Sequence, residues 1–153
     1  MLVEPEIPQN TGNIARLCAA TGSTLHLVGR LGFRTDEKAV RRAGLDYWHL
    51  VQVEEHTDLR ACLDKIGCKE PLLFTTKSET SYLDAPFREG DALVFGKETK
   101  GLDRSIIETY PSLFAIPTVS GSVRSLNLAN AVSVVVYEAL RATGALESAV
   151  PGP

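Results

Sequence analysis

Three short polar segments contain the residue types that could bind a ligand or support a reaction, and each borders an apolar stretch. The first is residues 8–16, Pro-Gln-Asn-Thr-Gly-Asn-Ile-Ala-Arg. Asn10 and Thr11 are suited to begin a helix, and Gly12 permits a tight turn. Arg16 then lies within about one turn of the positive helix end, where an acidic residue would be more favourable. Two interpretations stay open: Arg16 serves something beyond helix stability, or it is a surface arginine.

The second polar segment is residues 94–102, Val-Phe-Gly-Lys-Glu-Thr-Lys-Gly-Leu, directly after a predicted strand. It superficially resembles a phosphate-binding loop, but no Gly-Lys-Ser/Thr triplet closes it. The chain also lacks the GxGxxG motif with a downstream acid that is typical of dinucleotide-binding folds. Gly96 and Gly101 would let a ligand approach the backbone closely. The alternative is a plain connecting turn.

The third polar segment, residues 120–130, precedes a long apolar helix. Ser125 can cap that helix, which would leave Asn127 in the first turn and free to face a site. Capping does not explain Asn127 and Asn130, because asparagine is a poor helix former. The helix, expected over 126–143, is apolar on nearly all sides and must be covered by more than one neighbour. We therefore expect a polar site held on a rigid, buried base.

Length and composition predict one ordinary globular domain. The chain has 153 residues, of which 44% are hydrophobic and 23% charged, with a net charge of −3. We expect a single domain over 1–147 and a frayed tail over 148–153. The three cysteines, Cys18, Cys62 and Cys68, have neither zinc nor redox spacing, so we expect a reduced, cytoplasmic compartment and no metal. No apolar run reaches the length of a membrane span, so we expect no membrane.

Short apolar runs alternate with helical patterns, which predicts an α/β fold with a mainly parallel central sheet flanked by helices. The expected strands are residues 1–3, 24–28, 48–53, 72–75, 92–95 and 113–116. The expected helices are residues 13–21, 36–43, 57–66, 103–109 and 126–143. Thr57 is expected to cap the third of these helices, while Gly67 and Gly144 are expected to end the third and the last.

A local basic patch contrasts with the acidic net charge. It comprises Arg30, Arg34, Lys38, Arg41 and Arg42, and it carries an excess of three positive charges after the two nearby acids are counted. Such a patch can hold phosphates even when the whole chain is acidic. The alternative is a solvated helix face. The net charge itself argues against a general nucleic-acid-binding protein.

Taken in this order, the three polar segments resemble the signature motifs of the SpoU class of SPOUT RNA methyltransferases. The matching residues are Asn10, Gly12 and Arg16, then Phe95-Gly96-x-Glu98-x-x-Gly101-Leu102, then Ile116-Pro117, Ser125-Leu126-Asn127-Leu128 and Asn130-Ala131. Residues 4–8, 41–48, 75–77 and 130–138 are similar to the small TrmL (YibK) type, the tRNA wobble-nucleotide 2′-O-methyltransferases. The resemblance covers nearly the whole chain.

The resemblance implies a SPOUT (α/β-knot) fold with a deep C-terminal trefoil knot. It also implies a homodimer that packs the first and last helices, with Tyr137 facing the partner or the site. The implied cofactor is S-adenosylmethionine, and the implied substrate is tRNA. The positions that match the cofactor-binding residues of the family are Phe74, Thr75, Thr76, Gly96, Ile116, Ser125 and Leu126. The basic patch, residues 30–42, would meet the RNA.

By the same resemblance, the catalytic set is Arg16, Asn10, Ser125, Asn127 and Glu98. Arginine is an awkward base because its pKa is above about 12. We therefore expect Arg16 to hold a phosphate or to stabilise the developing alkoxide. Asn10, Ser125 and Asn127 would fix the ribose and the methionine end of the cofactor, and Glu98 would brace the middle loop.

The activity implied by the resemblance is methyl transfer to the ribose 2′-hydroxyl of tRNA nucleotide 34, with leucine tRNAs as the expected substrates. Two alternatives stay open from the sequence. The first is 2′-O-methylation of another tRNA position or of rRNA, because the core motifs do not separate these. The second is a nucleotide-binding or RNA-binding protein without catalysis, against which the intact catalytic set argues.

Overall fold

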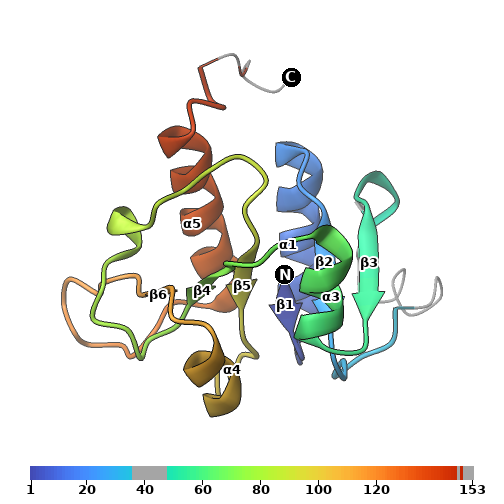
Figure 1. Cartoon of the computed structure of the whole chain (residues 1–153), viewed down its shortest axis with the longest axis horizontal. Coiled ribbons are helices and arrows are strands. Elements are labelled where there is room, and N and C mark those ends of the chain that lie inside the picture. The colour runs from blue at the N-terminus through green and yellow to red at the C-terminus, as the bar shows by residue number, and fades with distance from the viewer. Residues whose placement is uncertain (36–47, 148, 150–153) are drawn as a thin grey trace.

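The computed structural model describes residues 1–35, 48–147 and 149 (Figure 1). Within these residues, six short parallel strands form one sheet in the order β3-β2-β1-β5-β4-β6. The strands are β1 (Leu2–Val3), β2 (Leu25–Val28), β3 (Val53–His56), β4 (Leu72–Phe74), β5 (Leu93–Phe95) and β6 (Leu113–Phe114). The α/β class with a parallel sheet is therefore confirmed. The strand order reverses between β1 and β5, and such a switch point is where ligands bind in open α/β sheets.

In the described part of the chain, four helices cover the two faces of the sheet. They are α1 (Pro8–Thr21), α3 (Leu59–Ile66), α4 (Arg104–Thr109) and α5 (Leu128–Ala142), joined by the 3-10 turns η1 (Trp48–Leu50) and η2 (Tyr82–Asp84). Helices α1 and α5 lie against each other on one face, and α3 and α4 cover the other (Figure 1). Within the described part of the chain, no helix is long and apolar enough to cross a membrane.

The alternation of side chains along the strands divides the core into two clusters. Leu2 and Leu27 point towards α1 and α5, whereas their neighbours Val3 and Val28 point towards α3. This period of two is a property of extended backbone. Because both faces are covered, β1, β4 and β5 in the middle of the sheet consist of continuous apolar residues rather than of alternating apolar and polar ones.

Most predicted elements lie within two residues of their observed bounds, but two do not. Helix α1 begins at Pro8, not at residue 13, so Gly12 is a helical residue and not a turn. Proline at the first helical position is preorganised for a helix and has no N–H to leave unpaired. The strand predicted over 48–53 was also wrong, since a 3-10 turn occupies residues 48–50 and the strand follows it.

The predicted caps were partly wrong. Asp58, not Thr57, caps α3 by accepting a hydrogen bond from the Ala61 amide at 2.8 Å, while Gly67 ends that helix as predicted with φ of 71°. Asn127, not Ser125, caps α5. Gly144 follows the end of α5 with φ of 75°, a conformation that favours glycine. The helix predicted over 36–43 lies outside the described residues.

The chain returns from one edge of the sheet to its centre after the last strand. Strand β6 lies at the edge, yet the next helix, α5, packs against α1 and β5. The extended segment 115–127 makes this crossing. A knot in this part of the chain, which the resemblance implies, stays a prediction.

Candidate functional site

The predicted site residues follow strands that end next to one another. Residue 74 of β4 pairs with residue 95 of β5 and with residue 114 of β6, so the segments after these strands leave the same edge of the sheet. Strand β1, whose following helix carries Asn10, is the other neighbour of β5. The carboxyl ends of parallel strands are the usual ligand-binding edge of such sheets.

A chain of hydrogen bonds joins three of the predicted catalytic residues. The Asn10 side chain donates from Nδ2 to Glu98 Oε1 at 3.0 Å and accepts at Oδ1 from Asn127 Nδ2, also at 3.0 Å. Asn127 in turn accepts from the Ala129 amide at 2.9 Å and so caps α5. Residues from β5, α1 and α5 are thereby held in one unit.

Glu98 also compensates the start of α1. Its two carboxylate oxygens accept from the Glu6 amide at 2.8 Å and from the Ile7 amide at 3.2 Å. No side chain of α1 itself caps this end, where Ile7 is the capping residue. A carboxylate near the positive end of a helix is favourable for the helix dipole as well. Glu98 therefore braces the turn between β1 and α1, in addition to its own loop.

The glycines of the second motif are required by the shape of the loop. A Cβ on Gly96 would lie 2.1 Å from the Gly101 carbonyl carbon and 2.2 Å from the Leu102 nitrogen. Gly101 has φ of 68°, and its amide donates to the Lys97 carbonyl at 2.9 Å. The loop therefore closes back on the end of β5, and the tightest contact is backbone to backbone. This packing turns Glu98 towards α1.

Sequence reasoning missed a second set of contacts between the same two loops. Lys97 Nζ lies 2.6 Å from Glu4 Oε2, and that ion pair raises the pKa of the lysine. Glu6 accepts from the Thr99 hydroxyl at 2.8 Å and from the Thr99 amide at 3.2 Å. The only signal for these pairs was the presence of two acids before α1 and of polar residues in the loop 97–100. Their partners lie over 90 residues away in the chain, so spacing could not match them.

The predicted cofactor residues lie at the ends of β4, β5 and β6 and just before α5. Phe74 is buried, and its ring stacks on Phe95 with centroids 5.0 Å apart, so its ring is not available to a ligand. The Thr75 amide donates to the Phe114 carbonyl at 2.9 Å, which ties β4 to β6. Gly96 is buried at the end of β5, whereas four other predicted positions are exposed or half-buried, namely Thr76, Ile116, Ser125 and Leu126.

Two predicted catalytic residues lie apart from the hydrogen-bonded unit. Arg16 is exposed on α1, off the buried stripe of Ile14 and Cys18 as predicted. However, the earlier start of the helix places it about two turns from the positive end, so the argument from the helix dipole was wrong. Ser125 is exposed in the segment before α5 and caps no helix. In the basic patch, Arg30 and Arg34 are exposed, and Lys38, Arg41 and Arg42 lie outside the described residues.

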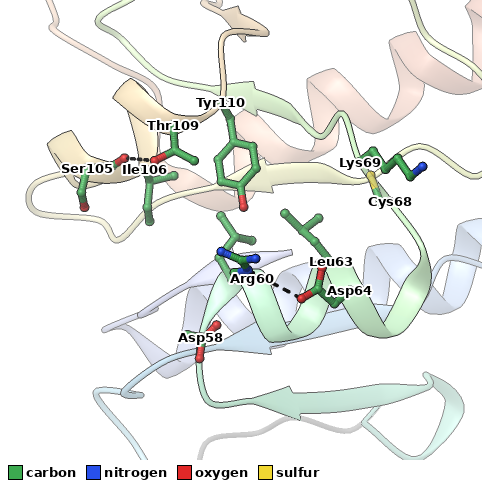
Figure 2. A pocket seen from close by; sticks show the side chains of 11 residues that line it. Asp58, Arg60, Leu63, Asp64, Cys68, Lys69, Ser105, Ile106, Thr109 and Tyr110 are labelled. Atoms are coloured by element: carbon green, nitrogen blue, oxygen red, sulfur yellow. Dashed lines mark hydrogen bonds and ion pairs between the residues drawn. The ribbon is translucent and has the colours of Figure 1, made fainter.

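A separate groove of about 580 Å³ lies on the opposite face, between α3 and α4 (Figure 2). Arg60 and Asp64 form an ion pair on α3, and the Tyr110 ring lies across from them. None of the predicted site residues that the structure describes lines this groove. The strand ends, not this groove, hold the predicted constellation.

The fold and the joined motifs define a class of RNA methylase. Residues 1–137 match the family model described as the SpoU rRNA methylase family, and the chain belongs to that family.

Similarity to known proteins extends over almost the full chain. The tRNA (cytidine(34)-2'-O)-methyltransferase of Escherichia coli strain K12 is 49% identical over 146 residues, which are 94% of this chain and 92% of the relative. A solved structure concerned with 2-OH methylation of C/U34 on tRNA has a TM-score of 0.83 and 45% identity, and covers 92% of both chains. The SpoU methyltransferase AviRb of Streptomyces viridochromogenes, solved with AdoMet, has a TM-score of 0.75 and 25% identity over 92% of this chain and 55% of its own.

Proposed function

We propose that this protein transfers a methyl group from S-adenosylmethionine to the ribose 2′-hydroxyl of nucleotide 34 of tRNA, with leucine tRNAs as substrates. The observation that carries the proposal is the hydrogen-bonded unit of Glu98, Asn10 and Asn127 at the switch point of the sheet. The E. coli relative named for this reaction covers the same span at 49% identity. Because its substrate is tRNA, we expect the protein to act in the cytoplasm.

The residues at the strand ends fit S-adenosylmethionine. The paired ends of β4, β5 and β6 bring the backbone of residues 75, 96 and 115–116 to one edge. Backbone amides and carbonyls there are suited to reading an adenine edge, and the half-buried Ile116 and the exposed Leu126 offer apolar surface for it. AviRb, of the same class, was solved with this cofactor. The cofactor supplies an electrophilic methyl group on a sulfonium. The protein and the RNA must align the two reactants and remove the proton of the 2′-hydroxyl.

Asn10 and Asn127 act mainly by positioning. Each side-chain amide can donate two hydrogen bonds and accept two, and each already donates one and accepts one within the unit. At most one donor and one further lone pair per residue are left for the ribose or the methionine end. The bonds therefore fix α1 relative to α5, and alignment of two reactants can supply about 7–11 kcal/mol of the barrier.

Arg16 is the residue proposed to assist the nucleophile. A 2′-hydroxyl must lose its proton as the new bond forms, and a guanidinium stays charged throughout. Arg16 therefore holds the neighbouring phosphate or stabilises the developing alkoxide. Arg16→Ala should lower the rate of methyl transfer while cofactor binding persists, and Arg16→Lys should restore part of that rate. Normal turnover in the alanine variant would contradict the role.

A homodimer through α1 and α5 is the second part of the proposal. Helix α5 is apolar, yet Val134 and Tyr137 remain 36% and 49% exposed on it. A second copy of the chain would cover this face. Val134→Lys should yield monomers by light scattering, whereas Ile66→Lys on α3, also an exposed apolar position, should leave the dimer intact. A wild-type chain that is monomeric at micromolar concentration would overturn the dimer.

The basic patch is proposed to bind the RNA. Arg30 and Arg34 are its exposed described members, and they follow β2 at the ligand-binding edge of the sheet. Replacing both by alanine should weaken tRNA binding and flatten its dependence on salt concentration, because phosphate contacts release counterions. An unchanged affinity and salt slope would remove the patch from the proposal.

One experiment tests the reaction and its substrate. The protein is incubated with methyl-labelled S-adenosylmethionine and either total tRNA or rRNA from a strain that lacks wobble methylation, and the labelled nucleotide is mapped by digestion and mass spectrometry. We expect label in the ribose of nucleotide 34 of leucine tRNAs. Label at another tRNA position or in rRNA would overturn the assignment of the substrate. Binding of cofactor without transfer to any RNA would overturn catalysis itself.

A further inference from the structure

Two imidazole rings and a thiol meet on the α3 face of the sheet, where none of the reaction's proposed residues lies. His26 comes from β2, His56 from β3 and Cys62 from α3. Their ligating atoms all lie within 4.8 Å of one another, and His26 Nδ1 is 3.0 Å from His56 Nε2. His26 is 9% exposed and Cys62 is fully buried.

The parallel register of β2 and β3 builds this cluster. It pairs His26 with Glu54 and Val28 with His56. Since side chains alternate along a strand, His26, Glu54 and His56 all point to the same face. Helix α3 covers that face and brings in Cys62, which packs in the same core cluster as Val28. The convergence is therefore set by the backbone and not by a flexible loop.

Glu54 places a carboxylate at the open side of the cluster, in addition to the two nitrogens and the sulfur. Its Oε2 atom lies 3.8 Å from His26 Nδ1 and 3.7 Å from His56 Nε2, the same two nitrogens that face each other. Its side chain is 25% exposed, so the cluster opens to solvent on this side and an ion has a path of entry. Lys65 Nζ lies 2.9 Å from the same oxygen and balances its charge.

We propose that His26, His56, Cys62 and Glu54 form a structural binding site for a divalent transition-metal ion, with Zn²⁺ as the preferred ion. Two imidazoles, a thiolate and a carboxylate are ligands that Zn²⁺ takes in four-coordinate sites. Metal–nitrogen and metal–sulfur bonds of about 2.0 and 2.3 Å imply ligand separations of about 3.4–3.6 Å in a tetrahedron. The observed separations bracket these values, so small side-chain rotations complete the site.

Such an ion would join the edge strand β3 to β2 and to α3. The cysteine spacing in the sequence predicts no metal, because only one of the four ligands is a cysteine and the ligands span residues 26 to 62. At present Cys62 Sγ contacts Met1 Sδ at 3.8 Å, and the two histidines share one hydrogen bond. Binding would replace these contacts with bonds to the ion and would stabilise the edge of the sheet against unfolding.

Cobalt serves as the probe, because a Co²⁺–thiolate bond gives a charge-transfer band in the near ultraviolet. The full chain is stripped with a chelator and titrated with Co²⁺, which is then displaced by Zn²⁺. We expect one ion per chain, a charge-transfer band that Zn²⁺ abolishes, and a higher melting temperature with Zn²⁺. Cys62→Ala should remove the band and weaken Zn²⁺ binding by more than about 100-fold. Cys68→Ala, a control at a cysteine outside the cluster, should change neither.

A second pair of variants keeps the test decisive if Cys62→Ala folds poorly. Glu54→Gln, at a partly exposed position, should keep the charge-transfer band and weaken Zn²⁺ binding at least about tenfold, as loss of a metal ligand does. His49→Gln, an exposed histidine outside the cluster, should behave as the wild type. Absence of one-to-one Zn²⁺ binding tighter than about 100 µM in the stripped wild type would overturn the proposal. A band of full intensity in Cys62→Ala would also overturn it.

Discussion

The strand-end site and the groove between α3 and α4 use charged groups in opposite ways. At the site, Glu98 bonds to groups 88 to 92 residues away, and Asn10 to one 117 residues away, in partly buried surroundings. Around the groove, Arg60 pairs with Asp64 and Arg104 with Glu108, each one helical turn apart and largely exposed. Exposed pairs of this kind contribute little to stability.

Polar residues that join distant segments therefore stabilise the fold, whereas exposed polar residues that pair within one helix contribute little to it. A carboxylate that holds two backbone amides and a side chain cannot be removed without leaving donors unpaired, and that costs more than the mean value of a hydrogen bond. A surface carboxylate returns to water when its partner is lost. The following predictions compare the two regions, from the largest expected effect to the smallest.

Gly96→Ala should abolish methyl transfer, because its Cβ would overlap the Gly101 and Leu102 backbone and the loop could not close. We expect the melting temperature to fall by several degrees and cofactor binding to be lost. The matched control is Gly90→Ala, which has φ of 83° but open space around a Cβ. It should lower stability by about 1 kcal/mol through backbone strain alone. Equal activities of the two variants would show that the loop tolerates opening.

Glu98→Gln should lower the free energy of unfolding by about 1–3 kcal/mol, because an amide NH₂ would face one of the donors that the carboxylate now accepts from. We expect methyl transfer to fall at least about tenfold, as α1 shifts relative to the loop. Glu108→Gln, in the exposed ion pair on α4, should stay within about 0.5 kcal/mol of the wild type. Denaturant titration and initial rates measure both. Similar losses of stability in the two variants would show that Glu98 contributes no more to the fold than an exposed carboxylate does.

Asn127 can be used to separate capping from the link to Asn10. Asn127→Asp keeps an oxygen for the Ala129 amide but loses the amide that donates to Asn10. Aspartate is as good a cap as asparagine, so the cap of α5 should persist. A carboxylate oxygen would then face the Asn10 Oδ1 acceptor in place of a donor, so the link between the two residues and methyl transfer should be lost. Asn127→Ala should lose about 1 kcal/mol of stability as well. If the aspartate variant keeps full activity, the link to Asn10 does not position the site.

The smallest expected effect is the pH dependence of the Lys97–Glu4 ion pair. The pKa of Lys97 is raised above the ordinary 10.5, chiefly by its hydrogen bond to Glu4. The charged form is therefore favoured in the folded state, so the contribution is fully present below pH 10.5 and is lost as the pH rises through the folded-state value. Denaturant midpoints of the wild type should decline more steeply above pH 10.5 than those of Lys97→Met. Lys69→Met, at the groove, should follow the wild type.

The sequence was sufficient for the class of fold. Strand and helix periods follow from local side-chain patterns, which is why β4, β5, β6 and α4 lie where they were predicted. The motif resemblance placed Glu98, Asn10 and Asn127 in one site, and the structure joins them by hydrogen bonds. Their long-range partners could not be matched by spacing.

The errors have two physical causes: a neighbouring residue formed the local cap at α3 and at α5, and a tertiary contact stabilises the start of α1. Ser125 and Thr57 have the right chemistry for caps, but a neighbouring Asn127 or Asp58 had better geometry. The start of α1 was misplaced because Gly12 was taken as a turn, whereas Glu98 compensates the helix end at residues 6 and 7 from outside the helix. Only the folded chain supplies that carboxylate.

The bond between Asn10 and Asn127 has a consequence for synthesis on the ribosome. Asn127 is made 117 residues after Asn10, so the loop, α1 and α5 cannot be locked together until α5 has emerged from the exit tunnel. Strands β1 to β5 can pair earlier, because everything they need has already been made. The protein therefore gains its shape before it gains a reactive centre, and no nascent fragment ending before residue 127 could modify RNA.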